Sequence, residues 1–133
     1  MVRSIIAVIV GMVVGMAANM ALILLNMKLF PGPEGLEFND TRAMRAYVDS
    51  LPQVAFLLPM VAHLSQALLG GWIAARLGAS RPLLLAMVVA LLTLIGGVMN
   101  MMSLPGPVWM WLEIPLYMVA GYVAGTTWQG GRF

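Results

Sequence analysis

Two titratable side chains, Glu113 and His63, lie within long apolar stretches of this 133-residue chain. Glu113 is the only acid in residues 108–127, and His63 is the only histidine in the sequence. A charged group inside a membrane is costly unless it is paired, hydrated or protonated, and such groups often mark proton relays. Histidine changes its charge near neutral pH. Together the two residues could relay protons, whereas a neutral His63 bonded to a neighbouring asparagine or tyrosine would be purely structural.

The sequence allows two depths in the membrane for Glu113. Counted from the outer end of its apolar stretch, it lies about six residues in, or roughly 9 Å at helical rise. Because Pro107 is close, the helix could instead begin lower and leave Glu113 in the headgroup region. There the acid would lie in the first turn of a helix, where the helix dipole favours negative charge.

Four more polar residues share a helical face with this pair or with a glycine of their own stretch. They are Asn19, Gln66, Asn100 and Tyr117. Each of the four lies three or four residues after Glu113, His63 or a glycine of the same stretch, and this spacing places the two residues on one side of a helix. Polar side chains in membrane spans can hydrogen-bond between helices. We therefore regard them, with Glu113 and His63, as the candidate intramembrane polar site.

No metal site and no cofactor are expected. The absence of cysteine excludes disulfides, thiolate metal sites and a cysteine nucleophile. The 13 methionines could bind Cu(I) through their thioethers, but methionine is also a flexible filler of apolar cores. Haem ligation would have a single histidine to support it. Because familiar hydrolase, zinc-protease and phosphate-loop motifs are absent, we do not expect an enzyme.

The composition is typical of a membrane protein. Of the residues, 62% are hydrophobic and 9% are charged, against about 45–50% and about 25% in soluble domains. Four stretches, residues 5–27, 54–75, 83–102 and 108–127, each reach the roughly 20 residues that cross the hydrocarbon core as a helix. The first is longer than the apolar core of a cleaved signal peptide, about 7–15 residues. We expect an all-α integral membrane protein, one domain over residues 1–133, folded as a four transmembrane helix bundle.

The first outer loop, residues 28–53, contains a further element. The segment from Pro31 to Gly35 breaks the first helix. Beyond it, apolar residues recur at helical spacing: Met44, Tyr47, Val48 and Leu51. This spacing predicts a short amphipathic helix along the membrane interface, with Tyr47 facing inward, although the same helix could dock a partner.

The basic residues predict the orientation. The side that carries both termini and the second-to-third loop holds four of them and no acid: Arg3, Arg76, Arg81 and Arg132. The other side holds three basic residues together with four acids. The positive-inside rule therefore predicts a multi-pass inner-membrane protein with both termini in the cytoplasm.

Small residues line one face of each span. The glycines concerned are Gly11, Gly15, Gly70, Gly71, Gly96, Gly97, Gly121 and Gly125. Small residues let membrane helices approach closely, so packing alone can account for this pattern. The same faces would suit association with a second copy or with another membrane protein.

Several segments resemble a family of small bacterial four-span inner-membrane proteins that has no assigned activity. The similarity covers the outer loop from Phe30 to Pro52, the segment from Gly70 to Arg76, and the segments from Pro107 to Trp109 and from Gly121 to Gly125. These motifs are structural: loops, a small-residue helix end and aromatic anchors. The resemblance implies a bacterial inner membrane and this topology, and it implies no activity.

The leading functional hypothesis is a non-enzymatic accessory or assembly subunit that acts through helix packing. The alternative is a small oligomeric transporter or channel in which Glu113 and His63 handle protons or a cation. The expected partners are the lipid bilayer and a second copy or another membrane protein. Nucleic acid is not expected, because the net charge is only +2 and no basic run is present.

Overall fold

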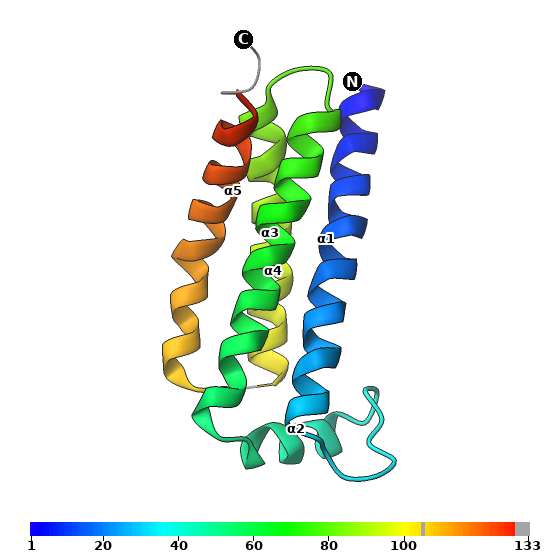
Figure 1. Ribbon diagram of the computed structural model, residues 1–133, viewed down its shortest axis with the longest axis vertical. Helices are drawn as coiled ribbons and strands as arrows, with labels where there is room; N and C mark the ends of the chain where they lie inside the picture. The colour runs from blue at the N-terminus through cyan, green and yellow to red at the C-terminus, as the bar shows by residue number, and fades with distance from the viewer. Residues whose placement is uncertain (105, 130–133) are drawn as a thin grey trace.

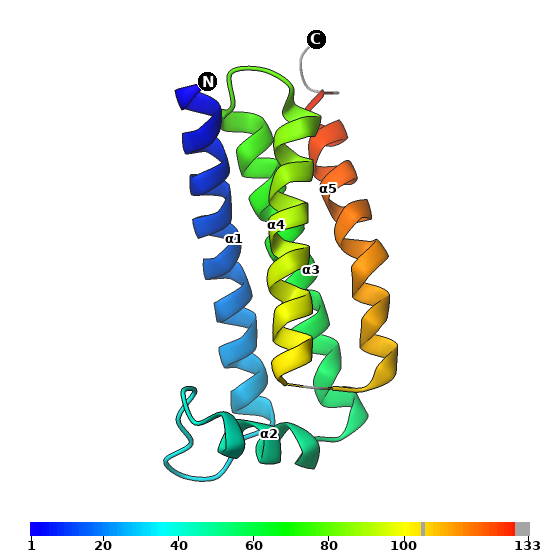
Figure 2. The same ribbon diagram turned by 180° about the vertical axis from the view of Figure 1, so that it is seen from behind.

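Four long helices run side by side and account for the four apolar stretches (Figures 1 and 2). The computed structural model describes residues 1–104 and 106–129. The long helices are α1 (Val2–Leu29), α3 (Leu57–Leu77), α4 (Pro82–Ser103) and α5 (Glu113–Gln129). Together with the turns that precede α3 and α5, these segments are long and apolar enough to cross a membrane. The prediction of an all-α bundle of four membrane-spanning helices is confirmed.

Prolines determine where three of the spans begin. The second and fourth spans open with short 3-10 turns, η1 (Gln53–Phe56) and η2 (Val108–Leu112). Pro52 and Pro107 stand directly before these turns in extended conformation. α4 begins at Pro82 itself, where the missing N–H would have had no helical partner. The fourth span, predicted over 108–127, is therefore α-helical only from Glu113 onward.

The short helix expected in the outer loop is α2 (Thr41–Ser50). Its first turn is capped by Asp40, whose carboxylate accepts a hydrogen bond from the Ala43 N–H at 3.0 Å. Met44 and Tyr47 are buried, so the inward orientation predicted for Tyr47 is confirmed. α2 lies across the end of the bundle opposite the N-terminus and the last turn of α5 (Figure 1).

Side chains of α2 attach it to two of the long helices. The Tyr47 hydroxyl donates to the Phe30 carbonyl at 2.5 Å, just beyond α1. Burial raises the pKa of Tyr47, which keeps this hydroxyl protonated as a donor. The Arg45 guanidinium donates to the Ser103 carbonyl at the end of α4, at 3.0 Å. α2 is thereby held over the space between α1 and α4.

Glycines allow α1 and α3 to touch backbone to backbone. A Cβ atom added at Gly15 would lie 2.6 Å from the Gln66 carbonyl oxygen, and one at Gly70 would lie 2.7 Å from that of Gly11. Real Cβ atoms essentially never approach other atoms so closely. A glycine is therefore required at each of these crossing points.

The other predicted packing glycines also lie against neighbouring helices of the same chain, with one exception. Gly71 lies against Ala124, Gly121 against Ala90, and Gly125 against Leu83. Gly97 lies against the ring of Tyr117. A Cβ at Gly96 would meet nothing within 4 Å. Among the predicted packing glycines, Gly96 alone faces open space.

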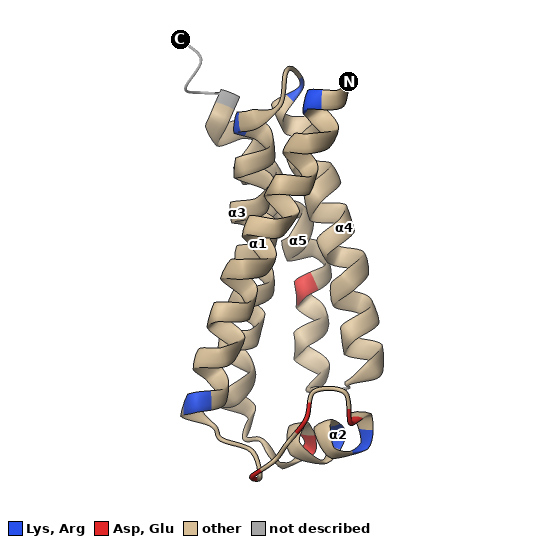
Figure 3. Ribbon diagram, turned by 90° about the vertical axis from the view of Figure 1, so that its right-hand side faces the viewer, with Lys and Arg blue, Asp and Glu red and all other residues tan. Residues whose placement is uncertain are grey.

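Charged residues gather at the two ends of the bundle (Figure 3). At the end with the N-terminus, the Arg3 guanidinium donates to the Leu77 carbonyl at 2.8 Å. Arg76 lies over the rings of Trp72 and Trp128, 5.2 and 5.5 Å from their centroids, within cation–π range. Arg132, the fourth basic residue assigned to this side, lies outside the described residues. One acid, on α5, lies inside the bundle (Figure 3).

Candidate functional site

A buried cluster of three side chains lies at the start of α5. The Glu113 side chain is completely inaccessible, with 0% exposure. Its Oε2 lies 3.0 Å from His63 Nδ1, and its Oε1 lies 3.2 Å from the same nitrogen. The Tyr117 hydroxyl donates to Oε2 at 3.1 Å. The carboxyl group therefore has two hydrogen-bonding partners, one of which can carry a positive charge.

Local sequence explains how the cluster forms. Glu113 and Tyr117 are four residues apart on α5, so the hydroxyl lies over the carboxyl group on the same face. Gly97 of α4 leaves room for the tyrosine ring, since a Cβ there would lie 2.9 Å from its Cζ. His63 reaches the carboxyl group from α3. The cluster thus depends on the packing of three helices.

The structure combines parts of both placements considered for Glu113. The residue is the first of α5, as in the placement that begins the helix lower. Its side chain is nevertheless enclosed by the protein, with His63 as partner, rather than open to the outside. The reason is that η2 precedes α5 and Met110 of this turn is itself buried, so the helix begins below the rim of the bundle.

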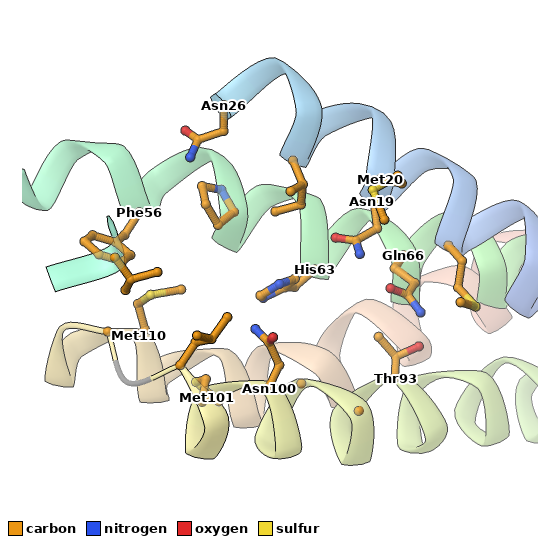
Figure 4. Close-up of a pocket in the computed structure, with 18 of the residues that line it drawn as sticks. Asn19, Met20, Asn26, Phe56, His63, Gln66, Thr93, Asn100, Met101 and Met110 are labelled. Atoms are coloured by element: carbon orange, nitrogen blue, oxygen red, sulfur yellow. The ribbon is translucent and has the colours of Figure 1, made fainter. Parts of the chain in front are cut away.

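A cavity of about 560 Å³ lies next to the cluster, between the long helices and beneath α2. His63 and Tyr117 line it, so the cluster forms part of its wall. Figure 4 shows polar side chains of α1, α3 and α4 around this space. The polar lining residues on these three helices are Asn19, Asn26, His63, Gln66, Thr93 and Asn100. The rest of the wall is mainly apolar and rich in methionine.

Two asparagines of α1 that line this cavity have side-chain oxygens that are buried without a hydrogen-bond partner. Asn26 is only 5% exposed, and its Oδ1 has no hydrogen-bond partner in the structure. The Oδ1 of Asn19 is also buried without a partner. A buried acceptor without a donor is costly, and such groups are usually satisfied by water or by a ligand. Two unsatisfied acceptors therefore lie buried beside the cavity.

The cavity is open at the side, between α1 and α4. Residues of its wall on these two helices are exposed, in contrast to the enclosed cluster behind them: Met16, Met20, Leu92, Gly96 and Asn100. This side of the molecule is formed by the membrane-spanning helices and not by the loops. A molecule dissolved in the bilayer could therefore reach the cavity directly between the two helices.

All six predicted polar residues belong to this one region. Glu113, His63 and Tyr117 are joined by hydrogen bonds, and Asn19, Gln66 and Asn100 line the adjoining cavity. Sequence reasoning omitted Asn26 from the site, although Asn26 lies seven residues after Asn19 on the same face of α1. That spacing was the available signal. The cavity itself had no sequence signal.

The methionines divide into two groups. Seven of them line the cavity: Met12, Met16, Met20, Met27, Met44, Met101 and Met110. Met99 and Met102 are instead highly exposed on α4 and do not line the cavity. Within residues 1–104 and 106–129, no group of three or more His, Asp or Glu side chains could hold a metal ion. The methionines thus give the cavity a soft apolar wall.

Comparisons with protein-family models, with curated proteins and with solved structures found no match to this chain.

Proposed function

We propose that this protein is a small membrane transporter that takes up and releases protons at the His63–Glu113–Tyr117 cluster. One observation carries the proposal: a carboxyl group with 0% exposure is paired with the only histidine of the chain at the wall of a cavity. Ionisable groups inside membrane spans are costly and commonly belong to ion or proton pathways. The cost is difficult to explain if the cluster serves packing alone.

The geometry gives each side chain a role. Because the carboxyl group of Glu113 occupies Nδ1, the other ring nitrogen of His63, Nε2, is the atom that can exchange a proton with the cavity. The carboxyl group and the ring are close enough to share a proton directly, at 3.0 Å between Oε2 and Nδ1. The Tyr117 hydroxyl donates to the same carboxyl group and holds it in place. His63 is therefore the group that exchanges with the cavity, and Glu113 is the group with which it shares a proton.

The packing of the glycines reduces the support for an accessory or assembly subunit. That hypothesis relied on small-residue faces that would be free for a partner. Gly11, Gly15, Gly71, Gly121 and Gly125 instead lie against other helices of the same chain. Nothing in the cluster or the cavity is needed for an assembly role, so transport is the function that the site supports better.

The transport proposal predicts that Glu113→Gln lowers proton flux to the rate of protein-free vesicles. The amide has nearly the same size as the carboxyl group but cannot take up or release a proton, so the cluster would lose one of its two exchanging groups. Flux would be measured with a pH-sensitive dye inside proteoliposomes, driven by a potassium diffusion potential. Glu34→Gln makes the same chemical change in the exposed outer loop and should leave the flux unchanged.

A second variant separates chemistry from misfolding. His63→Gln should also abolish the flux, and both variants should elute from gel filtration as the wild type does. Equal flux from the wild type and from folded Glu113→Gln would contradict the transport proposal.

We also propose a bacterial inner membrane as the location, with both termini in the cytoplasm. The basic residues at the end of the bundle that carries the N-terminus support this orientation. A cysteine introduced at Asp40 should react with a membrane-impermeant thiol reagent added to intact cells. A cysteine at Ser80 should react only after the cells are opened. Because the chain has no native cysteine, each label reports one position, and the reverse pattern would overturn the orientation.

A further inference from the structure

We infer that the cavity between α1 and α4 binds an uncharged lipophilic molecule that enters from the bilayer, and that the Asn100 amide hydrogen-bonds the polar group of this molecule. The inference rests on the proposed function in one respect, since it takes the bound molecule as the one that is transported. It adds the chemical class of that molecule. The site itself is argued from the cavity and not from proton exchange.

The size and the wall of the cavity indicate a ligand with an apolar body. A volume of about 560 Å³ lies within the range of about 300–1,000 Å³ that is common for small-molecule sites. The methionine thioethers and the rings of Phe38, Tyr47 and Phe56 line it. Flexible thioethers adapt to ligands of varied shape. Such a wall binds through the apolar area that it buries.

The charges around the cavity indicate a ligand without a formal charge. No lysine, arginine, aspartate or glutamate is present among the described residues that line it. The carboxyl group of Glu113 has 0% exposure, so a ligand cannot reach it. His63, the lining residue that can carry a positive charge, already has this carboxyl group as its partner. Because an ion without a counter-charge is costly in an apolar site, an uncharged molecule fits the cavity better.

The position of the opening indicates that the ligand arrives through the bilayer. Met20, Leu92 and Gly96, which line the cavity on α1 and α4, are exposed along the spans. At the outer end, Met44 and Tyr47 of α2 line the cavity and are buried, so α2 covers this end. The exposed side is the one that acyl chains surround in a membrane. Charged molecules are costly there, whereas uncharged lipophilic molecules dissolve.

The wall also contains a polar side chain that such a ligand can reach. Asn100 of α4 lines the cavity and is exposed at its open side. Figure 4 shows the Asn100 amide in the space between α3 and α4, pointing toward His63. An amide has donors and an acceptor, so it can hydrogen-bond a hydroxyl or a carbonyl group without any charge. The cavity therefore suits a lipophilic molecule with one such group better than a plain acyl chain.

Photolabelling of the full-length protein in phosphatidylcholine vesicles with tritiated benzophenone would test this inference. Benzophenone is an uncharged lipophile with one carbonyl group, and on irradiation it inserts into nearby C–H bonds. Met101 lines the cavity and is buried, whereas its neighbour Met102 is exposed on α4 and does not line it. Label at Met101, located by mass spectrometry of peptides, should saturate as the probe concentration rises. Label at Met102 should rise in proportion to the probe, as on any surface that contacts lipid.

Competitors define the chemical class of the ligand. All are compared at equal concentrations in the vesicle membrane at neutral pH, where 4-phenylbutylamine is protonated because its pKa is about 10.4, like that of lysine. Its uncharged isostere 4-phenylbutanol should protect Met101 with about tenfold or more higher affinity. Butylbenzene, which has no hydroxyl group, should protect about two- to tenfold more weakly than 4-phenylbutanol, the factor expected for one hydrogen bond.

Variants locate the binding to the cavity. Gly96→Leu should abolish the saturable label at Met101 by filling open space without a clash, since a Cβ at Gly96 meets nothing within 4 Å. Ile95→Leu, on an exposed neighbour that does not line the cavity, should be labelled like the wild type. In Asn100→Leu the difference between 4-phenylbutanol and butylbenzene should disappear, because the amide that distinguishes them is gone.

The outcomes separate the inference from the transport proposal. Label that does not saturate at Met101 would overturn the inference, because acyl chains would then fill the cavity as they cover Met102. Equal protection by the alcohol and the ammonium ion would overturn the uncharged class, and equal protection by the alcohol and butylbenzene would overturn the role of Asn100. Any of these results, with proton flux that still depends on Glu113, would leave the proposed function standing. Saturable label that 4-phenylbutanol prevents, without any proton flux in vesicles, would support the binding site and overturn transport.

Discussion

Replacing His63 with leucine is expected to lower the free energy of unfolding by about 1–3 kcal/mol, which is the typical cost of leaving a buried polar group without one of its hydrogen-bond partners. The variant leaves the carboxyl group of Glu113 enclosed at 0% exposure without its histidine partner. Tyr117 still donates one hydrogen bond to this carboxyl group. The loss should appear as a lower midpoint in detergent-denaturant unfolding followed by tryptophan fluorescence.

The double variant His63→Leu with Glu113→Gln is the informative comparison. A glutamine at position 113 carries no charge, and its side-chain oxygen can still accept from Tyr117. Replacing both members of a buried hydrogen-bonded pair costs less than leaving one member without its partner. The double variant should therefore be more stable than His63→Leu alone. If the two single changes instead add without coupling, the pair would not be an interacting unit.

Gly11→Ala should destabilise the bundle by separating α1 from α3. An added Cβ would collide with the carbonyl oxygen of Gly70, a backbone atom that cannot move aside as a side chain can. Overpacking of this kind costs typically about 1–3 kcal/mol, and occasionally more. The cost should exceed the gain of about 1 kcal/mol that alanine brings over glycine within a helix.

Gly96→Ala is the matched control for this change. It makes the same substitution in a long membrane helix, but at a position where the added methyl group meets nothing within 4 Å. It should be neutral or stabilising by up to about 1 kcal/mol through helix propensity alone. Equal unfolding midpoints for the two variants would show that the α1–α3 crossing does not require a glycine at position 11.

The same contacts explain why Gly121→Leu would be a poor test of partner binding. Gly121 already lies against Ala90 and the Ala86 carbonyl of the same chain. A leucine there would separate α5 from α4 before any partner could be affected. Loss of function in that variant would therefore report the fold of the bundle.

Most of the fold could be predicted because its determinants are local in sequence. Hydropathy and length define a span residue by residue, and a bilayer requires that each span satisfy its own backbone hydrogen bonds as a helix. The α2 helix was predictable for the same reason: its cap at Asp40 and its buried Tyr47 lie within one short segment. The 3-10 turn before α5 was not predicted, because Pro107 indicates a helix start without indicating which kind of turn follows.

The candidate site was predictable only as a set of residue types. The one acid and the one histidine within the spans could be singled out, because both are rare and costly in an apolar helix. Asn26 was left out although its spacing from Asn19 places it on the same face, whereas the cavity could not be predicted, because no pattern along one helix shows the distance to a neighbouring helix. Gly96 illustrates the limit: its sequence context matches that of Gly97, yet one faces open space and the other faces Tyr117.

The sequence by itself determined the class of this protein, its four spans and the residues worth testing. Only the tertiary structure decided that His63 and Glu113, 50 positions apart, meet at 3.0 Å. It also decided that most of the glycines on the small-residue faces pack against other helices of the same chain, and that a cavity remains between α1 and α4. The physical reason is that these features depend on the relative depth and rotation of separate helices. Backbone contacts between distant glycines set both, and no single helix contains that information.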